Sequence, residues 1–129
     1  MQLGYTIVYV PDVEVAVGFY ERAFGLMRKF VHESGHYGEL NTGETTLAFA
    51  SEAMAQMNGI AIRPHTPRDV AAAFELCLVT KDPDAAYARA LDAGAFAVKP
   101  AEQKPWGQRV AYVRDLNGCL VELCTPIVR

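Results

Sequence analysis

Two acidic residues, Glu75 and Glu122, are the side chains of this sequence best suited to do chemistry. Glu122 is the only charge in the apolar run LVEL at residues 120–123, where an unpaired carboxylate would be costly to bury. Side chains alternate along an extended strand, so Glu75 shares a face with Cys77, and Glu122 shares a face with Cys124. If both acids face one partly dry hollow, repulsion and burial raise the pKa of at least one. Such a pair serves as a general acid or base, or it attracts a cation.

Simpler roles for the two acids stay open at this point. Glu75 can be a surface charge on an edge strand, and Glu122 can pair with Arg109 or Arg114 across a sheet. Ion pairs of this kind are common on protein surfaces and contribute little.

The three cysteines, Cys77, Cys119 and Cys124, include no CxxC pair, and their odd number argues against a disulfide framework. We expect reduced thiols. For Cys77 and Cys124 we expect a packing role in the core and no part in catalysis.

The only tryptophan, Trp106, lies in the polar segment 100–108 between a proline and a glycine. An indole held there can stack on a planar ligand or lie over a cation. The alternative is a hydrophobic plug that closes the end of a sheet or packs on a dimer partner.

The elements that position these residues follow one order twice: strand, helix, then three strands. The first copy has strands at residues 5–10, 27–32, 37–41 and 45–50, and its helix begins at the cap Asp12 and ends at Gly25. The second copy has strands at residues 74–79, 96–99, 109–113 and 119–124, and its helix begins at Asp82-Pro83 and ends at Gly94. Asp12 and Asp82 are 70 positions apart, as are Tyr5 and Glu75, which indicates a duplicated module.

The sequence therefore predicts an α+β fold of two βαβββ modules, at residues 1–50 and 71–129. Residues 51–70 are predicted as the linker, with a short helix around Met54 and Met57 and a polar loop at residues 63–67.

Composition narrows the function. The chain has 129 residues, 51% of them hydrophobic, and a net charge of −3 with no basic stripe, so we expect no nucleic-acid partner. No apolar run approaches the roughly 20 residues of a membrane span, and residues 1–4 lack the pattern of a signal peptide. We expect a cytoplasmic protein with no membrane partner.

Three segments, "YVPDVEVAVGFYERAFGL", "DPDAAYARALDAGA" and "VRDLNGCLVEL", together with the paired βαβββ order, resemble the vicinal oxygen chelate superfamily. This group includes glyoxalase I, extradiol dioxygenases and bleomycin-resistance proteins. The resemblance runs from Leu3 to Pro126. It implies that each module curls into a half-barrel, that the half-barrels surround a shared cavity, and that the protein forms a homodimer.

In the metal-using members, four side chains from the first and last strands of both modules hold a divalent ion. The resemblance places these positions at Tyr5, Ala48, Glu75 and Glu122. Ala48 offers no ligand atom and the phenol of Tyr5 is neutral near pH 7, so no metal or other cofactor is favoured. If a divalent metal binds, Glu75 and Glu122 are its expected ligands, with His32, His36 or Glu39 as substitutes for the rest.

The run "QKPWGQ" is similar to a loop that borders the drug groove of bleomycin-resistance proteins, which bind without a metal of their own. The favoured function is therefore metal-independent binding of a small, antibiotic-like molecule that is cationic or aromatic. The expected ligand-binding residues are Trp106, Tyr5, Ala48, Glu75, Glu122, Phe49, Met54 and Met57, with Phe30 and Tyr37 as further candidates.

Two enzymatic alternatives stay open. One is a divalent-metal-dependent lyase, isomerase or dioxygenase like glyoxalase I, acting on a small carbonyl or thiol-adduct substrate. The other is a metal-free enzyme in which Glu75 or Glu122 is the acid or base.

Overall fold

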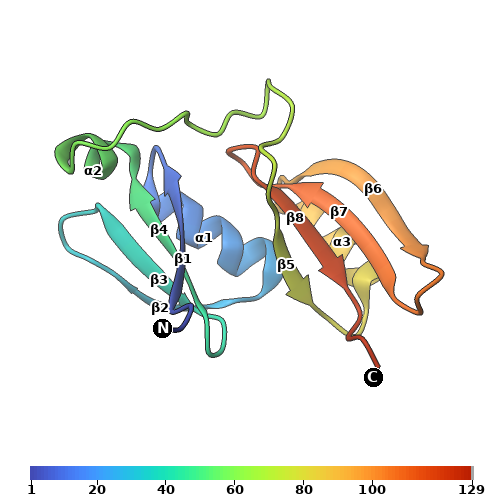
Figure 1. Cartoon of the computed structure of the whole chain (residues 1–129). Coiled ribbons are helices and arrows are strands. Elements are labelled where there is room, and N and C mark those ends of the chain that lie inside the picture. The colour runs from blue at the N-terminus through green and yellow to red at the C-terminus, as the bar shows by residue number, and fades with distance from the viewer. Residues whose placement is uncertain (129) are drawn as a thin grey trace. The chain divides into compact units, whose positions relative to one another are not determined.

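A computed structural model describes residues 1–128, and the chain divides into two compact units, Met1–Pro64 and His65–Arg129. The division lies inside the segment 51–70 that the sequence predicts as a linker. Each unit contains one four-stranded sheet and the same βαβββ order (Figure 1). The α+β class and the repeated module follow from this arrangement. No helix within residues 1–128 is long and apolar enough to cross a membrane.

The first unit has the strand order β1-β4-β3-β2, with β1 parallel to β4 and the other neighbours antiparallel. Its strands are β1 (Tyr5–Val10), β2 (Met27–Val31), β3 (Tyr37–Asn41) and β4 (Thr46–Ser51). Helix α1 (Val13–Phe24) packs on one face of this sheet. The Asp12 carboxylate accepts a hydrogen bond from the N–H of Val15 at 3.1 Å, and Gly25 ends the helix at a φ of 67°.

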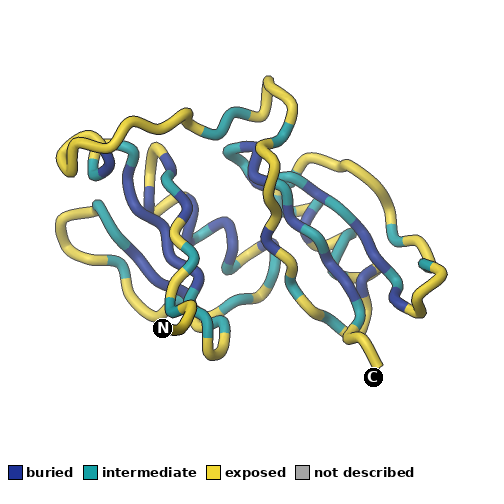
Figure 2. The backbone as a smooth tube through the Cα atoms, in the orientation of Figure 1, coloured by how far each residue is buried: buried dark blue, intermediate teal, exposed yellow. Residues whose placement is uncertain are grey.

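The core of the first unit lies between α1 and the sheet, as the buried segments of Figure 2 show. The ring of Phe49 on β4 packs on the ring of Tyr20 on α1 with centroids 4.9 Å apart. Side chains alternate along a strand, so Ala48 lies on the opposite face of β4. We call the sheet face turned away from the helix the open face of each unit.

The second unit repeats this topology with the order β5-β8-β7-β6, and β5 is parallel to β8. Its elements are β5 (Leu76–Val79), α3 (Pro83–Asp92), β6 (Phe96–Gln103), β7 (Arg109–Arg114) and β8 (Leu120–Cys124). The Asp82 carboxylate caps α3 by accepting from the N–H of Ala85 at 3.1 Å. Helix α3 packs on β6, β7 and β8, so the open face of this sheet is the side without α3.

Two predicted strand boundaries are wrong in the second unit. Strand β5 begins at Leu76, because the N–H of Phe74 bonds to the carbonyl of Ala72 in a turn instead of joining the sheet. Strand β6 continues to Gln103, through Pro100, into the predicted tryptophan segment. An edge strand accepts proline because its outer N–H groups need no partner, and the register of β6 shifts between Lys99 and Glu102.

The predicted linker has two structured ends. Helix α2 (Glu52–Met57) is capped by Ser51 and contacts β1 and β4, with Ala55 buried. At the other end, the Arg114 guanidinium donates to the carbonyls of Thr66 and Asp69 at 3.1 and 2.9 Å. These contacts attach residues 66–69 to the turn between β7 and β8.

That turn carries the Asp-Leu-Asn-Gly motif. The Asp115 carboxylate accepts from the N–H groups of Asn117 and Cys119, each at 2.9 Å, and Gly118 has a φ of 91°. Positive φ favours glycine, which explains the residue at this point. The turn sends the chain into β8 and so sets the position of Glu122.

Candidate functional site

Five side chains with chemical potential gather on the open face of the second unit. The strand register pairs Cys77 with Glu122 across β5 and β8, and Tyr112 with Glu122 across β7 and β8. Cys124 lies two residues beyond Glu122 on the same face of β8. Together with Glu75, just before β5, these residues form what we call the acid–thiol cluster: Glu75, Cys77, Tyr112, Glu122 and Cys124.

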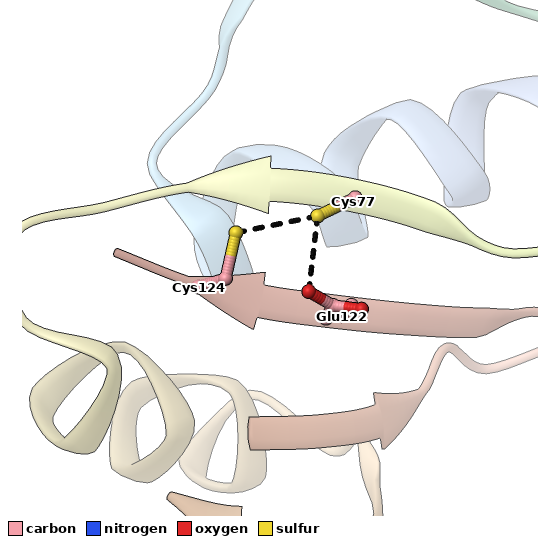
Figure 3. A group of neighbouring side chains, drawn as sticks. All are labelled: Cys77, Glu122 and Cys124. Carbon is pink, nitrogen blue, oxygen red and sulfur yellow. Dashed lines mark hydrogen bonds between the residues drawn. The ribbon is translucent and has the colours of Figure 1, made fainter. Parts of the chain in front are cut away.

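Glu122 is the centre of this cluster. The Tyr112 hydroxyl donates to Glu122 Oε1 at 3.2 Å, and the Cys77 thiol donates to Oε2 at 3.3 Å. The sulfur atoms of Cys77 and Cys124 lie 3.4 Å apart, as Figure 3 shows beside the contact to Glu122. The Glu75 carboxyl forms a further hydrogen bond with Glu122. The two acids that the sequence singles out are therefore brought together.

The two carboxyl groups have pKa values displaced in opposite directions. Loss of hydration raises the pKa of Glu75 to about 7, and the hydrogen bond and negative charge of Glu122 contribute to this rise. Burial also opposes ionisation of Glu122, but hydrogen bonds from Glu75, Cys77, Tyr112 and Cys124 outweigh it and hold its pKa below the ordinary value. Below about pH 7 the pair thus holds one proton, which lies on Glu75.

The other members of the cluster stay neutral. Loss of hydration around the sulfur is the main cause that raises the pKa of the Cys77 and Cys124 thiols, although Cys77 as a whole residue is exposed, and for Cys77 the neighbouring Cys124 and Glu122 add to the rise. Burial and the charge of Glu122 raise the pKa of Tyr112 to about 12. The cluster is therefore a single anion surrounded by neutral donors, suited to binding a cation or moving a proton.

Glu122 does not form the ion pair with Arg109 or Arg114 that was its simpler alternative role. Arg109 forms a two-pronged pair with Asp84, with N–O distances of 2.6 and 2.9 Å. Arg114 donates to backbone carbonyls, including that of Gly118 at 2.8 Å. Neither guanidinium is among the partners of Glu122.

The open face of the first unit carries different chemistry. Ala48 lies between Ile7 and Glu39 in the sheet register and has no exposed surface, and Tyr5 is exposed. The Tyr37 hydroxyl donates to the buried Glu39 at 2.7 Å, and Lys29 lies 3.5 Å from the same carboxylate. Burial and then Glu39 raise the pKa of Tyr37. The first unit thus has a phenol at Tyr5 and a methyl group at Ala48, the two positions in this unit that the resemblance assigns to metal ligands.

The remaining residues predicted to bind a ligand lie in different surroundings. Phe49 is fully buried against α1 and does not reach the open face. Met54 is half-buried and Met57 exposed, both on α2. Trp106 is 63% exposed, and its indole N–H donates to Gln108 at 2.7 Å, which fixes the ring and leaves it accessible.

The donor set at Tyr5, Ala48, Glu75 and Glu122 does not fit a hard divalent ion. Such an ion needs several oxygen or imidazole ligands, and these positions offer two carboxylates, a phenol and a methyl group. The structure adds two thiols that the sequence predicts as packing residues, although Cys77 is exposed. The sequence pattern that points to these thiols is strand alternation, which puts Cys77 on the same face as Glu75 and Cys124 on the same face as Glu122.

Two βαβββ units of this topology are the fold of a known class of protein. Residues 2–123 match the model of the Glyoxalase/Bleomycin resistance protein/Dioxygenase superfamily, and the chain belongs to this superfamily. Among curated proteins it is similar to YraH of Bacillus subtilis (strain 168), described as uncharacterized, with 28% identity over 125 residues, covering 95% of this chain and 97% of YraH.

Solved structures share the fold. A glyoxalase-related enzyme from Fulvimarina pelagi superposes with a TM-score of 0.80 at 21% identity, over 98% of this chain and 88% of that one. TioX from Micromonospora sp. ML1 superposes with a TM-score of 0.69 at 24% identity, over 97% and 98% of the two chains. At such identities the likeness concerns the fold alone.

Proposed function

We propose that this chain is a small-molecule-binding member of its superfamily, which takes an antibiotic-like ligand with a cationic group and needs no metal to do so. The observation that carries the proposal is the uncompensated charge at Glu122. The four side chains that stabilise this carboxylate by hydrogen bonds are Glu75, Cys77, Tyr112 and Cys124, none of which carries a positive charge. Within residues 1–128, neither Glu75 nor Glu122 forms an ion pair with Lys, Arg or His. A cationic ligand would supply the missing countercharge.

Aromatic surface supports a ligand with a planar part. The Trp106 ring is held by Gln108, whose own amide donates to the carbonyl of Thr125 at 2.8 Å. A ring fixed before binding loses little conformational freedom when a ligand stacks on it.

Metal independence is supported by the donor chemistry at the positions that metal-using relatives employ. Two of the four, Tyr5 and Ala48, supply no ordinary ligand for a hard divalent ion. A pair of carboxyl groups that shares one proton still carries one negative charge. It can therefore attract a cationic ligand without a bound metal ion.

The test is calorimetric titration with metal-free bleomycin, a cationic antibiotic with planar rings, in buffer that contains a chelator. Glu122→Gln and Trp106→Ala should each weaken binding roughly ten-fold, which corresponds to about 1.4 kcal/mol. Glu75→Gln keeps a neutral hydrogen-bond donor beside Glu122, so below about pH 7 it should bind as the wild type does. Glu102→Gln is the matched control, because Glu102 is an exposed acid of β6 whose side chain lies 3.7 Å from Lys104. Binding should also weaken as salt rises.

Two results would reject the proposal. One is the absence of binding to bleomycin and to a panel of cationic aromatic compounds in a thermal-shift screen. The other is binding that Glu122→Gln and Glu102→Gln change equally.

A metal-free enzyme is the second candidate, and one observation favours it. A Glu75 pKa of about 7 suits a general acid or base near neutral pH. For such an enzyme, Glu75→Gln would abolish turnover of a carbonyl substrate and leave its binding nearly unchanged. For a binding protein, no turnover would be seen with the wild type, and the same variant would leave binding nearly unchanged.

A further inference from the structure

We propose that Cys77, Cys124 and Glu122 form a binding site for a thiophilic divalent ion, Zn²⁺, within the second unit alone. This site differs from the four positions Tyr5, Ala48, Glu75 and Glu122, because two of its three donors are thiols and all three lie on β5 and β8. The inference goes beyond the proposed function and does not rest on it.

The three donor atoms already lie close together. The two sulfurs are 3.4 Å apart, Cys77 Sγ is 3.3 Å from Glu122 Oε2, and all three atoms lie within 4.8 Å of one another (Figure 3). In a tetrahedral Zn²⁺ site, bond lengths of about 2.3 Å to sulfur and 2.1 Å to oxygen place two sulfurs about 3.8 Å apart and sulfur and oxygen about 3.6 Å apart. These two distances would need to open by about 0.3–0.4 Å, and the Cys124 sulfur and the Glu122 carboxylate, which lie within 4.8 Å, would need to settle about 3.6 Å apart.

The surroundings orient the donors for an ion. Tyr112 holds Glu122 Oε1, so that the other oxygen, Oε2, faces Cys77. A partner that holds the distal oxygen of a ligating carboxylate is typical of metal sites. Three protein ligands leave the fourth tetrahedral position to water or to a ligand atom, as in zinc sites that act on substrates.

A plain packing role does not account for Cys77. Cys119 is the packing cysteine of this chain, fully buried, with its sulfur 3.8 Å from the carbonyl of Leu120. Cys77 is exposed, and its sulfur contacts a second sulfur and a carboxylate at once. An ion can therefore enter from the Cys77 side, with the buried Cys124 beneath it.

The donor chemistry selects the ion. Thiolate ligands favour Zn²⁺ over Mg²⁺ or Ca²⁺, which prefer oxygen. On binding, each thiol releases its proton to the buffer and Glu122 contributes its existing charge, so nothing is oxidised or reduced. Any organic cation that binds at Glu122 would compete with the ion for this carboxylate.

The experiment titrates the full chain, kept reduced and first freed of metal, with Zn²⁺ alone and with Co²⁺ as a spectroscopic probe. We expect one Zn²⁺ per chain, and for Co²⁺ the sulfur-to-metal charge-transfer absorption and intense visible bands of a tetrahedral thiolate site. Cys77→Ser and Cys124→Ser should weaken Zn²⁺ binding by about 100-fold or more, and Glu122→Gln by about ten-fold. Cys119→Ala is the matched control and should bind as the wild type does.

The proposal is overturned by Co²⁺ spectra without charge transfer, or by Zn²⁺ binding that both Cys77→Ser and Cys124→Ser leave intact. Cys77 is exposed, so Cys77→Ser should fold, which circular dichroism checks. X-ray absorption of the wild-type complex gives a test free of variants: two sulfur neighbours support the site and none refutes it. Because bleomycin is titrated in chelator, failure of that binding and failure of Zn²⁺ binding are separate results.

Discussion

Gly118 offers the sharpest test of how the turn before β8 is built. Its φ is 91°, and a Cβ atom at this position would lie 2.6 Å from the carbonyl oxygen of Thr66 and 2.7 Å from the nitrogen of Pro67. Contacts this short do not occur in stable structures, and both neighbours are backbone atoms that cannot turn away. Gly118→Ala must therefore displace residues 66 and 67, which Arg114 holds through the Thr66 carbonyl.

Two costs add for Gly118→Ala. A non-glycine residue at positive φ costs about 1–2 kcal/mol, and forced backbone shifts in a packed region cost about 1–3 kcal/mol. The expected loss is about 2–5 kcal/mol of the free energy of unfolding, and the melting temperature should fall by roughly 4 °C per kcal/mol.

Gly107→Ala is the matched control, because Gly107 lies in the same unit at a φ of 98° with nothing within 4 Å of the position that the added methyl group would take. It should cost only the conformational term, about 1–2 kcal/mol. Urea denaturation followed by far-ultraviolet circular dichroism measures both. Equal losses for the two variants would show that the contact with residues 66 and 67 does not crowd Gly118.

Two further predictions concern the second unit. Glu75 keeps its proton in the folded state up to a pH of about 7 but loses it near 4.5 when unfolded, so the free energy of unfolding should fall as pH rises through that window. Urea titrations in chelator should lose this slope in Glu75→Gln, and a slope that persists would contradict the shared proton. Gln108→Ala removes the acceptor of the Trp106 indole and a part-buried hydrogen bond to Thr125, so it should cost about 1–3 kcal/mol of the free energy of unfolding and lower the fluorescence anisotropy of Trp106. Exposed Gln103→Ala is the control, and equal anisotropy in both variants would contradict the role of Gln108.

The elements of the fold are predictable from sequence because their signals are local. Asp12 and Asp82 each cap a helix by accepting a hydrogen bond from the N–H three residues ahead. Strand alternation places Glu75 and Cys77 on one face, whichever strands lie beside them. The same alternation could have prevented one error. Ala48 and Phe49 are adjacent in β4, so they cannot both face a ligand, and Phe49 packs on α1.

The thiol contact was not predictable in the same way. It depends on the parallel register of β5 and β8, which sets Cys77 against Glu122 and brings Cys124 within 3.4 Å of Cys77. Register between strands far apart in sequence is fixed by the whole sheet and leaves no local pattern. The bond from Trp106 to Gln108 likewise depends on the shape of the β6–β7 turn.

Comparison of the two repeats indicates that the acid–thiol cluster serves a function. The register pairs Ile7 with Ala48 in the first unit where it pairs Cys77 with Glu122 in the second, and Ala50 stands where Cys124 does. The first unit thus forms the same four-stranded sheet with small and apolar side chains at these positions. The same sheet forms in the first unit without this carboxylate, so the fold alone gives no reason to keep Glu122. An organic cation or a zinc ion would each pair with its negative charge, and both proposals therefore depend on this one carboxylate.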